Sequence, residues 1–267
     1  MPGSISLFQK GNNPKLNLLN RSVIKIKMKY TCLLLSSFLF LTCLEVKGQS
    51  DTGEGIANKN YTDADSLTKV RAFDEAIELL EKASKTYRES NNSKGYVKCL
   101  LKLAQNCYQK FDWEKSYEYA KECLQFSLQE FGEKSIFTAK SYLWIGLYQQ
   151  IKEKNTIALE FFHKTIKIIK SNDLNDLEVL IDVYNFSARS YYNKSDNRNS
   201  LKYLELAIAA SAELNGEGAL RTIQLMLNKG VIYYGSSRLK KSLDTYLSLL
   251  PLLQDSTFQH RSMLISL

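Results

Sequence analysis

The sequence predicts an all-α protein, a solenoid of antiparallel helix pairs, and three features lead to this expectation. A small residue returns every 42 positions, and a second small-residue series keeps the same step twelve residues later. Large apolar residues recur between them at i, i+3, i+4 and i+7, the spacing of one buried helix face, and no sustained stretch has the period of a strand. Self-similarity at a period of 20 to 50 residues is typical of solenoids, in which one helical unit stacks on the next.

The small residues mark the places where the two helices of a pair approach most closely. A bulky side chain there would push the helix axes beyond their usual spacing of about 8–10 Å. The first series is Ala64, Ala104, Gly146, Ala188 and Gly230, with a first step of 40 residues. The second series is Ala76, Ser116, Ala158, Ser200 and Ser242. The third series, seven residues further on, is Ala83, Cys123, Thr165, Ala207 and Leu249.

Polar segments separate the predicted helices, because Asp, Asn, Ser and Gly bond locally to the backbone or accept positive φ. Turns within pairs are expected at 110–112, 153–155, 194–199 and 235–237. Turns between pairs are expected at 89–94, 131–134, 171–176 and 215–218. The resulting plan is a linker at 49–56 and five helix pairs over 57–255. Residues 256–267 are expected to be the first part of a further helix, either truncated or an atypical cap.

The same positions resemble the tetratricopeptide repeat. One unit matches it with Leu103, Ala104, Trp113, Ser116, Ala120 and Cys123, and the next with Ile145, Gly146, Ala158, Phe162 and Thr165. The 42-residue unit, and the stretch 131–134, resemble the longer kinesin-light-chain-like variant. The chain departs from the pattern in two ways: the proline after the second helix is missing, and the usual Trp anchor is replaced by Leu100, Tyr142, Tyr184 and Met226. The resemblance covers about residues 57–267 and implies a right-handed superhelix.

The resemblance also implies a binding site, because the family's first helices line a concave groove. Their mixture of Tyr, Gln, Asn and Leu suits a protein or peptide ligand, and tyrosine offers large contact area with few rotamers to order. The alternative for each tyrosine is packing between neighbouring helices. Carried over by repeat phase, the predicted groove residues are Leu101, Gln105, Tyr108, Gln109, Lys140, Leu143, Leu147, Gln150, Asn185, Arg189, Tyr192, Asn193, Leu227, Val231 and Tyr234.

The N-terminal segment predicts export. A 14-residue apolar stretch, 31–44, follows three lysines and precedes a small residue at Gly48, which is the pattern of a secretory signal peptide over 28–48. The stretch is too short for a membrane span of about 20 residues. Residues 1–27 are interpreted as an extension preceding a natural start at Met28. A lipid anchor on Cys43 is the alternative to cleavage after Gly48.

The charge of the chain argues against nucleic acid as a partner. The formal net charge is +8, but residues 1–48 hold seven Lys or Arg against Glu45 alone. That leaves 29 basic and 27 acidic residues in 49–267. A nearly balanced surface gives little electrostatic attraction to a phosphate backbone.

No residue pattern predicts catalysis, a metal site or a small-molecule cofactor. His163 and His260 have no acidic or thiol partner at a recognisable spacing. Cys99, Cys107 and Cys123, an odd number beyond the leader, lie at or near helix-packing positions and are interpreted as buried structural thiols.

Three functions fit this sequence. The first is an exported scaffold that binds a protein or peptide in its groove, without catalysis of its own. The second is the recognition or regulatory part of a longer enzyme or signalling protein, since exported long-repeat arrays resemble the N-terminal regions of bacterial CHAT-type cysteine peptidases and of sensor kinases. The third is an adaptor that self-associates through an apolar C-terminal edge containing Met263, Leu264, Ile265 and Leu267. The sequence leaves the oligomeric state open.

Overall fold

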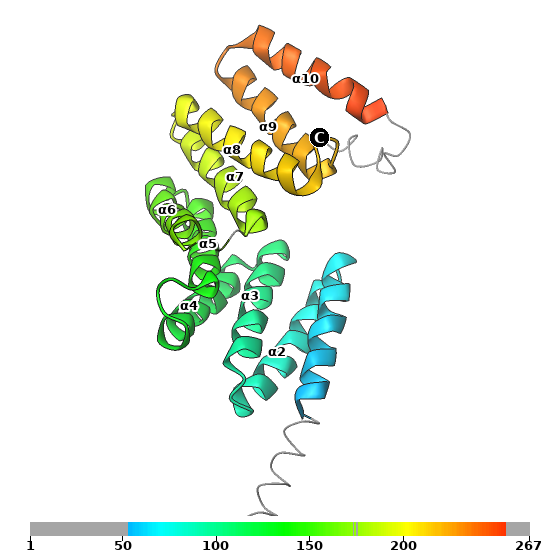
Figure 1. Cartoon of the computed structure of the whole chain (residues 1–267), viewed down its shortest axis with the longest axis vertical. Coiled ribbons are helices and arrows are strands. Elements are labelled where there is room, and N and C mark those ends of the chain that lie inside the picture. Colours follow the sequence, from blue (N-terminus) through cyan, green and yellow to red (C-terminus); the bar gives the residue numbers. More distant parts are fainter. Residues whose placement is uncertain (1–52, 173, 175, 255–267) are drawn as a thin grey trace, which may run out of the picture. The chain divides into compact units, whose positions relative to one another are not determined.

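The computed structural model describes residues 53–172, 174 and 176–254, and every regular element in that part of the chain is an α-helix (Figure 1). Contacts divide the chain after Gly55, and the unit from Ile56 onward carries the helical array. The helices, in order, are one over residues 53–69, then α2 (Phe73–Glu89), α3 (Ser93–Gln109), α4 (Trp113–Glu130), α5 (Ile136–Ile151), α6 (Asn155–Ser171), α7 (Leu177–Asn193), α8 (Asn197–Asn215), α9 (Leu220–Gly235) and α10 (Leu239–Gln254).

The helices stack in chain order, as a solenoid requires. From α2 to α10 each helix packs against the next, and α5 also touches α3 and α7, the first helices of the neighbouring pairs. The predicted helix pairs are therefore confirmed. Residues 53–56 are already helical, which corrects the linker predicted at 49–56. The predicted segments 1–27, 28–48 and 256–267, with Cys43 and His260, lie outside the described residues.

The described helices include none that is both long enough and apolar enough to cross a lipid bilayer.

The small-residue series are buried contact points between paired helices. A Cβ placed on Gly146 of α5 would lie 2.5 Å from a ring carbon of Phe162 in α6, and Phe162 itself is fully buried. Gly230 is similarly close to Tyr246 of α10. Because real Cβ atoms do not approach other carbons so closely, the glycines allow an aromatic ring to pack closely against the neighbouring helix.

Hydrogen bonds explain why the first two series are separated by twelve residues. The buried hydroxyls of the second series donate to backbone carbonyls of the first series in the partner helix. Ala76 and Ala158 are the two members of the second series without a hydroxyl. The bonds are Ser116 Oγ to Ala104 O (2.8 Å), Ser200 Oγ to Ala188 O (2.8 Å) and Ser242 Oγ to Gly230 O (2.9 Å).

The turns repeat one backbone geometry. The middle residue of each turn within a pair has a positive φ of 59° to 67°; these residues are Arg71, Phe111, Glu153, Ser195 and Ser237. Between pairs, Gly132 and Gly216 have positive φ. Gly235 does not belong to the turn predicted at 235–237: it ends α9, and its missing side chain leaves room for the Tyr192 hydroxyl. The side chains that accept a backbone N–H at helix starts are Asn92, Asp112, Ser135, Asp176 and Asp196.

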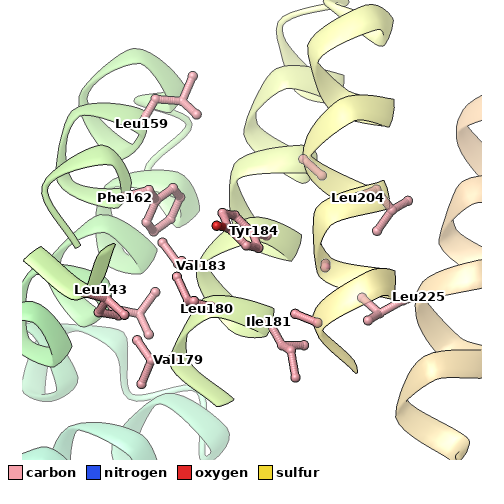
Figure 2. Packing of buried hydrophobic residues seen from close by; sticks show 14 of the residues in the cluster. Leu143, Leu159, Phe162, Val179, Leu180, Ile181, Val183, Tyr184, Leu204 and Leu225 are labelled. Atoms are coloured by element: carbon pink, nitrogen blue, oxygen red, sulfur yellow. The ribbon is translucent and has the colours of Figure 1, made fainter. Parts of the chain in front are cut away.

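The core runs through the array between successive helices. Figure 2 shows part of the largest cluster, in which Leu143 of α5, Phe162 of α6, Tyr184 of α7 and Leu204 of α8 lie along one continuous apolar layer. Each pair thus buries its apolar face only by stacking on its neighbours. This is the reason why a repeat unit of this kind is not stable alone.

Candidate binding groove

A cavity of about 620 Å³ runs across the first helices of the pairs. Its walls come from the helix over 53–69, from α3, α5 and α7, and from the start of α9. Residues from five first helices line a single cavity because these helices lie side by side in the stack. We call this cavity, together with the smaller cavities lined by α7, α9 and α10, the first-helix groove.

The smaller cavities extend the groove along α7 and α9. One, of about 390 Å³, is lined by Asn185, Arg189, Tyr192 and Asn193 of α7 and by residues of α9. Another, of about 440 Å³, is lined by Leu227 and Val231 of α9 and by Tyr246 of α10. Polar amides and apolar side chains both line these walls.

Thirteen of the fifteen predicted groove residues line one of these cavities. Two of the thirteen, Leu143 and Leu147, have side chains that are 4% and 1% exposed, so they form the floor of the groove and belong to the core. The thirteen are Leu101, Gln105, Tyr108, Gln109, Lys140, Leu143, Leu147, Asn185, Arg189, Tyr192, Asn193, Leu227 and Val231.

Gln150 is a correction to the predicted site. Its side chain is 4% exposed and is used inside the protein. The amide Nε2 donates to Ser190 Oγ at 2.6 Å and to the Phe186 carbonyl at 2.8 Å, and Oε1 accepts from Arg189 Nε at 2.7 Å. Gln150 therefore joins α5 to α7 and offers no surface to a ligand.

The three predicted groove tyrosines have different surroundings. Tyr108 is half-buried and packs against the Trp144 ring, with centroids 5.6 Å apart. Tyr192 is half-buried, with its hydroxyl against Gly235 of the next first helix. Tyr234 is 67% exposed. Tyr108 and Tyr192 thus combine packing between helices with a place in the groove wall.

Among the described residues, five basic and two acidic ones line the groove cavities, and three of the basic residues pair with carboxylates of a neighbouring first helix or its N-cap. Lys102 donates to Asp65 and, with Lys69, holds the pKa of that carboxyl below its usual range. The groove walls remove water from Asp182 and raise the pKa of its carboxyl, although Arg221 acts in the opposite direction. The pairs are Lys102–Asp65 (2.5 Å), Lys140–Asp176 (2.9 Å) and Arg221–Asp182 (2.6 Å).

Sequence reasoning missed three groove residues that its own period could have found. Lys140 is one of the predicted groove residues. Lys98 lies one 42-residue period before it, Asp182 one period after it and Gln224 two periods after it. All four line the groove cavities. Asn228 was also missed; it faces Asn185 across α7 and α9, with Nδ2 3.5 Å from Oδ1.

The His163 ring is partly exposed, and its Nε2 lies 3.0 Å from the hydroxyl of Tyr203; partial loss of water around the ring lowers its pKa. Within residues 53–172, 174 and 176–254, no group of three or more His, Cys, Asp or Glu side chains is placed to hold a metal ion. The described groove offers hydrogen bonds and apolar contact.

No protein-family model and no curated protein sequence matches the chain. Solved structures do match it. A Rap protein in complex with competence and sporulation factor is 16% identical, with a TM-score of 0.63 over 73% of this chain and 53% of that one. The putative kinesin light chain repeats of Podosopora anserina are 12% identical, with a TM-score of 0.57 over 73% and 93%. BtubC from P. vanneervenii is 18% identical, with a TM-score of 0.56 over 76% and 90%.

The fold is that of tetratricopeptide-like repeats. The Podosopora structure is described in those terms, and the chain covers almost all of it. The chain spans about half of the Rap protein. At these identities the likeness establishes the fold, and the tetratricopeptide-like arrangement accounts for the first helices lying together along the groove.

Proposed function

We propose that this chain is a protein-interaction scaffold that binds a peptide or an extended protein segment along the first-helix groove. The observation that carries the proposal is the shape of the main cavity, which five successive first helices line. Helix axes in contact are about 8–10 Å apart. A cavity that crosses several of them is elongated and suits a chain better than a compact small molecule.

The chemistry of the walls supports a peptide ligand. Gln105 and Gln109 line the cavity on successive turns of α3, and neither side chain makes a hydrogen bond to another described residue. Each amide offers a donor and an acceptor, which is what the main chain of a peptide requires. With the ion-pair partners Asp65 and Asp176 counted, five basic residues stand against four acidic ones, which favours a ligand without a large net charge. The Rap protein crystallised with competence and sporulation factor has the same fold, which adds support.

Replacing Gln105 and Gln109 together by alanine is expected to weaken peptide binding without changing stability. Peptides would be selected from a random phage-displayed library on the full chain, and affinity measured by fluorescence anisotropy. Two lost hydrogen bonds at about 0.5–1.5 kcal/mol each correspond to a rise in Kd of about 5- to 150-fold. The melting temperature should stay within about 2 °C, because neither amide bonds to another described residue.

The matched control is Gln125→Ala with Gln129→Ala. These two glutamines have the same spacing on α4, are exposed and do not line the groove. Their removal should leave Kd unchanged. Failure to select any peptide, or equal losses in both double variants, would contradict binding in the groove.

We further propose that the scaffold is exported, which rests on the basic and apolar pattern of residues 28–48. Expression of the full chain in a bacterial host, followed by mass spectrometry of the periplasmic fraction, tests this. A mature N-terminus at Gln49 is the expected result. A lipid-modified Cys43 would support the anchored form, and an unprocessed chain in the cytoplasm would contradict export.

A further inference from the structure

An apolar stripe runs along the last described helix. Leu243, Leu247 and Leu250 of α10 are 56%, 51% and 47% exposed, and their spacing places them on one helix face. Leucines exposed singly are common on protein surfaces, whereas a row of them on one face marks a contact surface.

The repeat shows what this face of a second helix does elsewhere in the array. One period earlier, the same positions of α8 face α9: Glu205 pairs with Lys229 at 2.9 Å, and Ser211 Oγ lies 2.8 Å from Thr222 Oγ1. Leu201, at the position of Leu243, is only 8% exposed. The α8 positions are Leu201, Glu205, Ile208 and Ser211, and the matching α10 positions are Leu243, Leu247, Leu250 and Leu253.

The other end of the array differs in chemistry. On the helix over 53–69, the positions that would face a preceding second helix are occupied by Ile56, Lys59, Asp63 and Ser66, all of them exposed. A copy of the chain stacked end to end would place the two charged side chains, Lys59 and Asp63, against the leucine stripe. That arrangement is unfavourable, because charged groups would lose water without gaining partners.

The junctions between pairs also follow a rule of matched polarity. At each junction, one buried residue of the second helix has the same type of side chain (aromatic, hydroxyl or aliphatic) as one buried residue of the following first helix. The four pairs are Tyr87 with Tyr96, Ser127 with Thr138, Ile169 with Leu180, and Ser211 with Thr222. The next pair in the sequence is Leu253 with Leu264, which again matches.

We propose that the leucine stripe of α10 docks a further first-type helix of this chain that begins near residue 262. Leu264, Ile265 and Leu267 fall one period after Thr222, Ile223 and Leu225, which are all buried in α9. Residues 255–267 lie outside the described part of the chain, so the register comes from the sequence and the docking surface from α10. The array thereby continues past its fifth pair.

The test is a cysteine cross-link across this junction. In a background with Cys32 and Cys43 changed to serine, Leu253→Cys with Leu264→Cys is compared with Leu253→Cys with Met263→Cys. Met263 is one period after Arg221, which pairs with Asp182 of α7 and so points away from α8. The native thiols stay unreactive because burial raises the pKa of Cys99 to about 12 and of Cys107 and Cys123 to about 11.

Oxidation at low protein concentration should close an intrachain disulfide at least tenfold faster in the 253/264 variant than in the 253/263 variant. The length of chain between the two cysteines is nearly the same in both variants. The ratio of the two oxidation rates therefore reports which residue of the docked helix faces Leu253. Equal rates, or no disulfide in either variant, would overturn the proposal. Disulfide-linked dimers from Leu253→Cys alone, forming at a rate that rises with concentration, would also overturn it and assign the stripe to a second copy.

Discussion

Replacing Gly146 by leucine is expected to lower the free energy of unfolding by about 3 kcal/mol or more, because overpacking a tight core contact costs about 1–3 kcal/mol and a whole isobutyl group adds to that. Helix propensity alone predicts the opposite sign, since glycine inside a helix is about 0.5–1 kcal/mol worse than alanine. Packing outweighs propensity here because the first added carbon would already lie 2.5 Å from the buried Phe162 ring. Thermal and urea unfolding followed by circular dichroism measures the difference.

Two further variants separate this packing effect from a general intolerance of leucine. Gly218 lies in the turn before α9 with nothing within 4 Å of an added Cβ, so Gly218→Leu should change stability by less than about 0.5 kcal/mol. Combining Gly146→Ala with Phe162→Leu should cost less than the two single changes together, because the smaller side chain makes room for the methyl group. Strict additivity would show that Gly146 and Phe162 are not in the contact described.

Removing the Gln150 side chain is expected to destabilise the array and not merely to weaken ligand binding. Gln150→Ala loses the bonds to Ser190, to the Phe186 carbonyl and to Arg189, each worth about 0.5–1.5 kcal/mol, so the expected loss is about 1.5–4.5 kcal/mol. The measurement is urea unfolding, with the free energy of unfolding calculated from the transition midpoint and the slope. Unchanged stability together with a loss of peptide affinity would contradict this structural role and show that Gln150 contacts the ligand.

Gln149 is the control for this change. It precedes Gln150 in α5, is partly exposed, and its side chain makes no hydrogen bond to another described residue, so Gln149→Ala should be nearly neutral. A double-mutant cycle with Ser190→Ala should give a coupling of about 0.5–1.5 kcal/mol, since one hydrogen bond joins the two side chains. An absent coupling would mean that the bond contributes nothing.

The position of a residue within the repeat predicts most of the residues that line the groove cavities. Residues at equivalent positions that do not line them show what this position cannot predict. Positions 108, 150, 192 and 234 have the same phase, yet Tyr108 and Tyr192 line the cavities, Tyr234 is 67% exposed and Gln150 is buried. The backbone places all four alike. What differs is the length and polarity of each side chain and the groups that the next first helix presents to it, and Ser190 and Arg189 are within reach of Gln150 alone.

The sequence by itself determined the helix pairs, their period and the turns, because close helix contacts require small residues and turns require polar ones at fixed spacing. The resemblance to tetratricopeptide repeats also predicted a binding groove along the first helices. Only the tertiary structure decided that Leu143, Leu147 and Gln150 belong to the interior, and that Lys98, Asp182 and Asn228 join the groove wall. The physical reason is that exposure depends on what neighbouring pairs pack against a side chain, which the period within one unit does not encode.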